Sequence, residues 1–196
     1  MVGCDGGRTR IRERGFSTLE LMLVICIMGM MAGIAITKID LAKMEANSAV
    51  QVLSTTMVAG QREAITKQHN LILTFDASQR TMRMVWDRNN NSAIDNGERV
   101  RAIPLDGRIG FGTGGATPRT FGANPINFDR DIGGRPALIF HRNGSASGIG
   151  GFYLTSTRAM ADPPKYATDT RAVEIVRATG RTEWYRWTGT AWKRGF

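Results

Sequence analysis

The sequence of 196 residues predicts an α+β fold in which one long N-terminal helix packs on a C-terminal antiparallel β-sandwich. Two observations support this fold. Residues 16–69 contain no proline, and their apolar residues form first a continuous run and then a helical stripe. From residue 70 onward the pattern changes to short alternating segments separated by glycine and asparagine. One long helix followed by many short strands is typical of an α+β protein.

The composition argues against an enzyme. The two histidines, His69 and His141, are far apart in the sequence, which disfavours a histidine zinc site or a nucleophile–histidine pair. The two cysteines, Cys4 and Cys26, exclude a disulfide scaffold and a multi-cysteine metal cluster. Lys and Arg (26) outnumber Asp and Glu (17), so the formal net charge is +9. This excess permits an anionic partner such as nucleic acid or a membrane surface without identifying one.

Residues 1–15 and 16–37 form two contrasting segments at the N-terminus. The first carries four arginines against two acids, whereas every residue of 21–36 is apolar or glycine. As a helix, residues 16–36 would be about 31 Å long, enough to cross the hydrocarbon core of a bilayer. The preceding basic residues predict a cytoplasmic N-terminus and an exported C-terminus. The alternative to this transmembrane helix is a buried core helix.

One carboxylate, Glu20, lies close to the start of this apolar segment. An ionisable group in an apolar helix is costly unless it is paired, so Glu20 is a candidate functional residue. A second interpretation is that the side chain merely lies near the lipid headgroups, because it is within about one helical turn of the end. That interpretation leaves the adjoining Gly15-Phe16 junction unexplained.

Residues 14–21 read Arg-Gly-Phe-Ser-Thr-Leu-Glu-Leu and resemble the processing motif of type IV prepilins and type II secretion pseudopilins. That motif is Gly-Phe-Thr-Leu-x-Glu. This chain departs from it because Ser17 precedes Thr18, but Glu20 is still fifth when counted from Phe16. The resemblance implies that a prepilin peptidase removes the leader, residues 1–15, by cleaving between Gly15 and Phe16, and then methylates the new amine of Phe16. It also implies that Glu20 pairs with the N-terminal amine of a neighbouring subunit, which would set the axial stagger during assembly.

Residues 38–69 are expected to form the amphipathic second half of the same helix. The inward face consists of small and apolar residues at four-three spacing, namely Ala46, Val50, Leu53, Met57, Gly60 and Ala64. Charged residues occupy the other faces. We therefore predict one continuous helix from about Phe16 to about Lys67, whose second half packs on the soluble domain.

Residues 70–196 are predicted to form the β domain. Strands are expected at residues 71–75, 81–86, 99–103, 108–112, 137–141, 151–155, 172–178 and 182–187. The glycine-rich segment 112–115 lacks the Gly-Lys-Ser/Thr that follows in a phosphate-binding loop, so it is interpreted as a connection. Residues 104–136 match no pattern that indicates a role.

Four segments of the last third, residues 139–148, 151–154, 173–176 and 179–181, are similar to the C-terminal domain of the GspH/FimT family of minor pseudopilins and minor pilins. In that family one hairpin strand ends in a Phe-x-x-x-Gly-Ser turn and a later strand ends in Thr-Gly-Arg. The resemblance implies a pilin-like fold and a GspH-like minor pseudopilin of a type II secretion pseudopilus. Such a subunit assembles through its N-terminal helix and supports protein export across the outer membrane.

The partners implied by this resemblance are other major and minor pilins or pseudopilins, the prepilin peptidase and the inner-membrane assembly platform. The implied location is the bacterial inner membrane, with a single pass, a cytoplasmic N-terminus and a periplasmic C-terminal domain, followed by transfer into a pseudopilus or pilus. Two alternatives stay open. One is a FimT-like minor type IV pilin involved in pilus assembly or DNA uptake, and the other is a single-pass anchored domain that binds calcium or another ligand.

Residues 87–98 have the ligand spacing of an EF-hand calcium loop. Oxygen-bearing side chains stand at loop positions 1, 3, 5, 9 and 12, namely Asp87, Asn89, Asn91, Asp95 and Glu98. Ca²⁺ prefers about six to eight oxygen ligands, so this set is a candidate calcium site, and no other cofactor is predicted. Ser92 replaces the usual glycine, and strands instead of helices flank the loop, so a polar β-turn is the competing interpretation.

The C-terminal segment combines basic and aromatic side chains. Candidate contacts to nucleic acid are Arg181, Arg186, Lys193 and Arg194. Such side chains neutralise phosphates, and the interleaved aromatic rings can stack on bases. The DNA-linked branch of the family favours a Gly-Arg-x-Arg turn, where this chain has Glu183 in place of the second arginine. The competing interpretation is a strand that buries alternate aromatic rings and leaves its arginines solvated.

Overall fold

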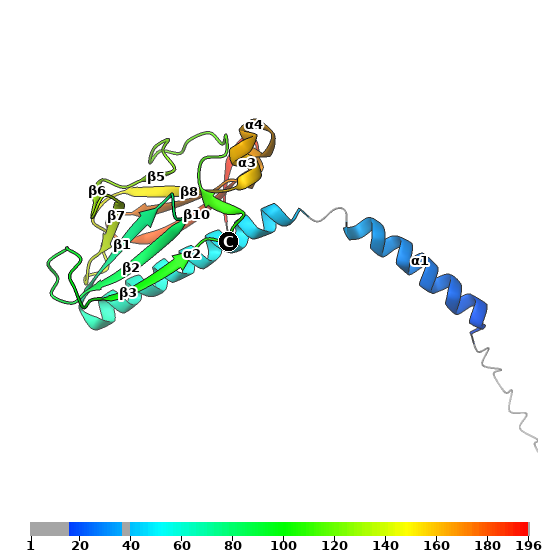
Figure 1. Cartoon of the computed structure of the whole chain (residues 1–196), viewed down its shortest axis with the longest axis horizontal. Coiled ribbons are helices and arrows are strands. Elements are labelled where there is room, and N and C mark those ends of the chain that lie inside the picture. Colours follow the sequence, from blue (N-terminus) through cyan, green and yellow to red (C-terminus); the bar gives the residue numbers. More distant parts are fainter. Residues whose placement is uncertain (1–15, 37–39, 196) are drawn as a thin grey trace, which may run out of the picture. The chain divides into compact units, whose positions relative to one another are not determined.

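The computed structural model describes residues 16–36 and 40–195, of which residues 34–36 are described in backbone only. The chain divides into two compact units, residues 1–40 and 41–196. The first unit contains helix α1 (Thr18–Ile36), and the second contains helix α2 (Leu41–Lys67) and all of the described strands (Figure 1). The predicted α+β class with antiparallel sheets is confirmed.

Helix α1 begins immediately after a capping serine. The Oγ of Ser17 accepts a hydrogen bond from the Leu19 amide at 3.2 Å, and the Ser17 carbonyl oxygen accepts one from the Leu21 amide at 3.1 Å. A side chain in this position satisfies an amide that has no partner within the first helical turn. The serine that distinguishes this motif from the prepilin pattern therefore defines the start of the helix.

Among the described residues, no helix combines the length and the hydropathy needed to cross a membrane. The predicted transmembrane helix over residues 16–37 is therefore not supported. Two further predictions concern other segments: the continuous helix from residue 16 to residue 67 would include residues 37–39, and the leader comprises residues 1–15. Both segments lie outside the described residues.

Helix α2 buries one face along its length. The buried residues follow the four-three spacing of the sequence, namely Ala46, Val50, Leu53, Ser54, Met57, Gly60 and Ala64. The absence of a side chain at Gly60 makes room for Leu71 and Met84, with which a Cβ atom would collide. A larger residue at Gly60 would therefore force the helix or these core side chains to move.

The strands form two sheets in which every pair is antiparallel. The first sheet has the order β3-β2-β1-β7-β6 and the second has the order β11-β10-β9-β8-β4, with β5 paired to β8. The first sheet consists of β1 (Asn70–Asp76), β2 (Thr81–Asp87), β3 (Arg99–Pro104), β6 (Arg130–Asp131) and β7 (Pro136–Phe140). The second consists of β4 (Ile109–Phe111), β5 (Ile126–Asn127), β8 (Gly150–Ser156), β9 (Arg171–Val176), β10 (Arg181–Trp187) and β11 (Trp192–Arg194). All eight strands predicted from the sequence are present, whereas β5, β6 and β11 are additional.

One hydrophobic core joins both sheets to α2, which runs along them (Figure 1). Aromatic rings connect the two sheets within it. The ring of Phe75 on β1 lies 5.1 Å from that of Phe152 on β8 and 6.1 Å from that of Phe111 on β4, measured between centroids. Ring pairs at such separations add to the stabilisation that burial provides, so these three residues hold the sandwich together.

A short helical segment follows β8 and was not indicated by any sequence pattern. It comprises α3 (Thr157–Ala161), α4 (Pro163–Tyr166) and a 3₁₀ turn (Ala167–Asp169). Asp169 is fully buried, and its carboxylate accepts hydrogen bonds from Ser156 Oγ at 2.5 Å and from Arg158 Nε at 2.7 Å. This network ties the end of the helical segment to the end of β8.

The turn between β1 and β2 contains a strongly hydrogen-bonded carboxylate. Asp76 accepts hydrogen bonds from Ser78 Oγ (2.6 Å), the Gln79 amide (2.9 Å) and Arg135 Nε (2.9 Å). These contacts, of which the Ser78 hydrogen bond contributes most, hold the pKa of Asp76 well below its usual range. Because the pKa is lower in the folded state, Asp76 stabilises the protein above the pKa of the unfolded group and loses this effect on acidification.

We expect the thermal midpoint to fall as the pH drops below about 4, the pKa of an unfolded aspartate. Asp76→Asn should have a lower midpoint than the wild type at neutral pH, and the difference should shrink in acid. Thermal unfolding of both proteins between about pH 2 and about pH 7 would measure this linkage. A difference that stayed constant across this range would contradict the prediction.

Candidate functional site

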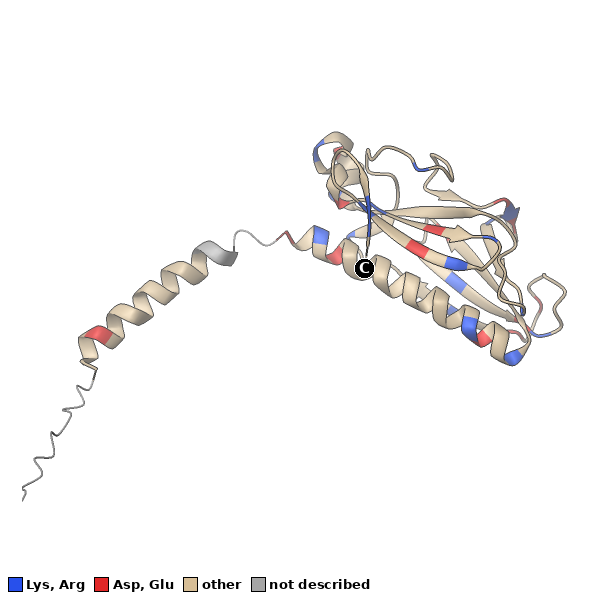
Figure 2. Cartoon of the chain, turned by 180° about the vertical axis from the view of Figure 1, so that it is seen from behind, with Lys and Arg blue, Asp and Glu red and all other residues tan. Residues whose placement is uncertain are grey.

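Glu20 lies in the first turn of α1 and is the one charged residue of this helix (Figure 2). Its neighbours are apolar and uncovered, since Leu19 is 73% exposed and Met22 is 70% exposed. Every residue from 16 to 33 is exposed. Glu20 has no ion-pair partner within the described part of the chain. Over its described side chains, α1 therefore presents an apolar helical surface on which Glu20 is the single carboxylate.

The face of α2 that points away from the core forms a second uncovered surface. Leu41, Met44 and Val52 are 57%, 56% and 54% exposed, respectively. The same stripe continues through the exposed residues Ser48, Thr55 and Ala59. Spacings of three and four residues place these side chains on one side of the helix. The stripe carries no charge over these positions, which makes it suitable for contact with another apolar surface.

The candidate calcium residues lie in the loop between β2 and β3, where their oxygens are used internally. Asn89 and Asn91 both donate from Nδ2 to Asp95 Oδ2, at 2.8 and 2.7 Å. Asp87 is fully buried and accepts hydrogen bonds from the Asn91 and Ser92 amides at 3.1 and 2.8 Å. The loop therefore holds its shape through hydrogen bonds between its own polar groups.

Glu98, the last candidate ligand, also faces the loop backbone. Its carboxylate accepts hydrogen bonds from the Arg88 and Asp95 amides, each at 3.1 Å. Within the described ranges, no group of three or more His, Cys, Asp or Glu side chains is arranged to hold a metal ion. The structure brings the five candidates into one loop, and calcium binding stays a prediction.

The four candidate nucleic-acid contacts are divided between the two faces of the second sheet. Tyr185 is opposite Arg194, and Arg186 is opposite Lys193, in the register of β10 and β11. Because successive residues of a strand face opposite sides, Arg181 and Arg194 lie on one face while Arg186 and Lys193 lie on the other. The sheet does not gather the four side chains into one surface.

Glu183 lies between Arg181 and Arg194 on one face of the second sheet, which we call the outer face. Its carboxylate pairs with Arg181 and Arg194, each at 2.9 Å, and accepts the Tyr185 hydroxyl hydrogen bond at 2.7 Å. The Tyr185 hydrogen bond contributes most to lowering the pKa of Glu183, and the two arginine charges act in the same direction. The acid that replaces the second arginine of the Gly-Arg-x-Arg turn therefore neutralises its basic neighbours.

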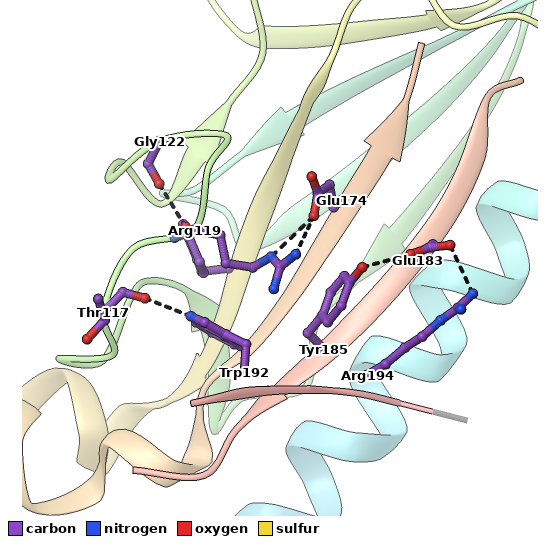
Figure 3. Close-up of polar contacts among 9 residues, drawn as sticks. Thr117, Arg119, Gly122, Glu174, Glu183, Tyr185, Trp192 and Arg194 are labelled. Carbon is purple, nitrogen blue, oxygen red and sulfur yellow. Dashed lines mark hydrogen bonds and ion pairs between the residues drawn. The ribbon is translucent and has the colours of Figure 1, made fainter. Parts of the chain in front are cut away.

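A cluster around Arg119 covers the same outer face (Figure 3). The Arg119 guanidinium lies 3.6 Å from the centre of the Tyr185 ring and donates to Glu174 Oε2 from Nη2 at 2.7 Å. Trp192 of β11 donates from Nε1 to the Thr117 carbonyl oxygen at 2.8 Å. Residues 104–136, for which the sequence indicates no role, thus include a segment that packs on the outer face of the second sheet.

No sequence signal identifies this cluster. Arg119 and Glu174 are separated by 55 residues, and although Glu174 lies in the segment 173–176, no sequence pattern relates it to Arg119. Their contact depends on the path of the loop that joins β4 to β5, which contains several glycines with positive φ. The segment 112–115, interpreted as a plain connection, is hydrogen-bonded to the sheet through the Gly112 amide and the Tyr153 carbonyl oxygen at 3.0 Å.

Tyr153→Phe tests how the loop is held. The Tyr153 hydroxyl donates to the Gly122 carbonyl oxygen and accepts from the Arg119 amide, both at 2.7 Å, and burial raises its pKa. The substitution removes both hydrogen bonds, so we expect the free energy of unfolding to fall by about 2 kcal/mol. Urea unfolding monitored by tryptophan fluorescence would measure the loss. An unchanged unfolding midpoint would show that the loop is held by ring packing alone.

A hollow of about 700 Å³ lies on the second unit beside the loop that follows β7. Its wall combines the exposed apolar residues Ile149 and Val176 with Arg130, His141 and Arg177. Burial lowers the pKa of His141, and the charge of Arg130 lowers it further. The hollow thus offers positive charge beside apolar surface, as many protein contact sites do.

Comparison with known proteins gives only structural similarity. No family model matches the chain, and no curated protein matches it. The chain is similar to the minor pseudopilin EpsH from the type 2 secretion system of Vibrio cholerae in two solved structures. One has a TM-score of 0.43 and 11% identity over 70% of this chain and 94% of the other. The second has a TM-score of 0.45 and 15% identity over 71% of this chain and 95% of the other.

Proposed function

We propose that this chain is a minor subunit of a pilin-like filament, of the GspH-like kind found in type II secretion pseudopili. The observation that carries the proposal is α1, an exposed apolar helix with a single carboxylate at Glu20. Burying an exposed large apolar side chain gains about 1.5–3 kcal/mol, so a helix of this composition is expected to be covered by other apolar surfaces. Neighbouring subunits of a filament supply such surfaces.

Glu20 makes this interpretation more specific than general apolar association. A carboxylate inside a bundle of apolar helices needs a positive partner, because an unpaired buried charge is strongly destabilising. Cleavage between Gly15 and Phe16 would create a new amine four residues before Glu20. An amine from one subunit and the carboxylate of the next can neutralise each other, which would fix their relative stagger.

The uncharged outer stripe of α2 extends the surface that subunits could share. Leu41, Met44 and Val52 are exposed on it, and the globular part covers only the opposite face of the helix. In the proposed filament this stripe would face neighbouring helices, while the β domain would be outside. The partners would be other pilins or pseudopilins.

The proposal includes a route to the filament. The subunit would be held in the bacterial inner membrane with a cytoplasmic N-terminus and a periplasmic β domain. A prepilin peptidase would then process it, and the assembly platform would transfer it into the filament. The basic leader, with four arginines in residues 1–15, supports the orientation because positive charge is retained on the cytoplasmic side.

The experiment that tests this proposal is co-expression of the full chain with a prepilin peptidase and a major pseudopilin. Intact mass measurement should show loss of residues 1–15 and the addition of one methyl group. The processed chain should then co-purify with sheared filaments. Gly15→Leu is the control, and it should leave the chain unprocessed and absent from filaments. An unprocessed wild-type chain that never enters filaments would favour the single-pass anchored domain instead.

A further inference from the structure

A pocket of about 280 Å³ lies where the C-terminal end of α2 meets the loop between β2 and β3. It is lined by Lys67, His69, Trp86, Arg88, Gly97 and Arg99. Three separate stretches of the chain, residues 67–69, 86–88 and 97–99, therefore enclose a space large enough for a small ion. Three of the lining side chains are permanently positive at neutral pH, which makes the pocket a candidate for an anionic ligand.

The nearby acids do not balance these charges. Glu63 uses one oxygen, Oε1, for both Lys67 (2.7 Å) and Arg99 (3.1 Å), and the Lys67 hydrogen bond is the main cause of its lowered pKa. Glu98 instead accepts backbone hydrogen bonds within its own loop. The Arg88 guanidinium has no hydrogen bond or ion pair in the described part of the chain. Three cations thus outnumber the two nearby carboxylates, and the contacts of Glu63 show that a carboxylate can approach Lys67 and Arg99 together.

Two ring nitrogens at the pocket also lack partners. The Trp86 side chain is 4% exposed, yet its Nε1 makes no hydrogen bond within the described residues. The indole is close enough to the Glu63 carboxylate to help lower that pKa, so its N–H group faces the charged centre of the cluster. His69 Nδ1 is likewise buried without a partner. Both nitrogen atoms have almost no accessible surface, so they face the protein interior, and the contacts to a ligand in the pocket come from the three cations.

The position of Arg99 is fixed by the same tryptophan. Its guanidinium lies 4.2 Å from the centre of the Trp86 ring, so cation–π attraction holds it over the indole. Glu63 restrains the same guanidinium at 3.1 Å. A cation held in this way loses less conformational entropy when it binds a ligand than a free arginine on the surface would.

We propose that this pocket binds a small oxyanion, either a phosphate group or a carboxylate, through the charges of Lys67, Arg88 and Arg99. Charge-assisted hydrogen bonds from several cations are the usual way in which proteins recognise such groups. The site lies entirely on the second unit. It does not depend on cleavage or filament assembly, so it can be tested separately from the proposed function.

Isothermal titration of the full-length chain in detergent would test the site, with inorganic phosphate and glutarate as separate probes. A titration with sodium chloride of equal ionic strength is the reference. After the heats of that reference are subtracted, we expect one phosphate or one glutarate bound per chain. Tighter binding of phosphate would identify a phosphate group as the ligand, and tighter binding of glutarate would identify a carboxylate. Heats equal to those of sodium chloride for both probes would overturn the proposal.

Three variants identify the pocket as the binding site. Arg88→Ala should weaken binding about tenfold, because it removes one cation from direct contact. Trp86→Phe replaces the indole by a smaller ring, which weakens the cation–π contact that holds Arg99, and it should weaken binding about threefold. Glu63→Gln removes the competing carboxylate and should tighten binding. Arg186→Ala on β10 is the matched control and should bind as the wild type does. Equal affinities in Arg88→Ala and the wild type would contradict the assignment.

Discussion

Replacing Arg158 with methionine is expected to lower the free energy of unfolding by about 3 kcal/mol, the largest effect on stability that we predict for a single side chain. Arg158 contacts Asp169 through Nε at 2.7 Å and through Nη2 at 3.0 Å, and the Asp169 side chain is fully buried. Methionine preserves the aliphatic stem but leaves the carboxylate with Ser156 as its remaining side-chain donor. An uncompensated buried charge is much more costly than the loss of an exposed ion pair.

Arg181→Met is the matched control for this result. Arg181 also pairs with a carboxylate, that of Glu183, but its side chain is 59% exposed and Arg194 remains as a second partner. The control should therefore cost less than about 1 kcal/mol. Urea unfolding monitored by tryptophan fluorescence would compare both variants with the wild type. Equal, small losses would show that Asp169 is hydrated or protonated when its partner is absent.

A double variant separates the charge from the packing. Adding Asp169→Asn to Arg158→Met removes the buried carboxylate, so part of the lost stability should return. If the double variant were less stable than Arg158→Met alone, the Ser156 hydrogen bond would have to be the dominant contact of the network. The comparison also shows how firmly α3 and α4 are attached to the end of β8.

Elements with strong local periodicity were predictable from the sequence. The buried face of α2 follows the four-three spacing from Ala46 to Ala64, and eight of the described strands coincide with short apolar or β-branched segments bounded by turn residues. The helical spacing arises because α2 buries one face, whereas strands that are buried along their whole length, such as β1, read as short continuous apolar runs. Asp40 is not helical and directly precedes α2, whereas the apolar pattern predicts a helix through it; aspartate is a favoured N-cap residue, so the start of α2 has a local signal that the apolar spacing does not show.

The parts that were not predictable depend on contacts between distant segments. The packing of Arg119 on Tyr185 joins residues that no local pattern relates, and the buried pair of Arg158 with Asp169 forms across three short helical turns. Short elements such as β5 and β11 contain too few residues to show a period. Their positions follow from the tertiary fold.

The candidate basic site illustrates a different limit. Arg181, Arg186, Lys193 and Arg194 are close in sequence, which suggested one surface, but the alternation of β10 and β11 places them on two faces. The candidate calcium loop has the expected spacing of oxygen donors. Spacing does not determine where each oxygen points, and in the structure several accept hydrogen bonds from the loop itself.

Glu20→Ala is expected to reduce incorporation of the chain into filaments by at least about tenfold, because the proposed pairing with a neighbouring amine would be lost. Processing between Gly15 and Phe16 should continue, since Glu20 lies within the mature part of the chain. The second unit should keep its stability, because the helix that carries Glu20 belongs to the first unit. The amount of chain in sheared filaments, measured by immunoblotting against total chain, gives the result.

Two further variants determine whether the charge of Glu20 is what matters. Glu20→Gln has nearly the same shape and should fail as Glu20→Ala does, because an amide cannot neutralise a buried amine. Glu45→Ala removes one carboxylate from α2, where it pairs with exposed Arg108 at 3.4 Å, and should assemble normally. If Glu20→Gln assembled as well as the wild type, the carboxylate would not set the stagger of subunits. The apolar surface of α1 alone would then have to account for assembly, and register would have to come from the stripe on α2.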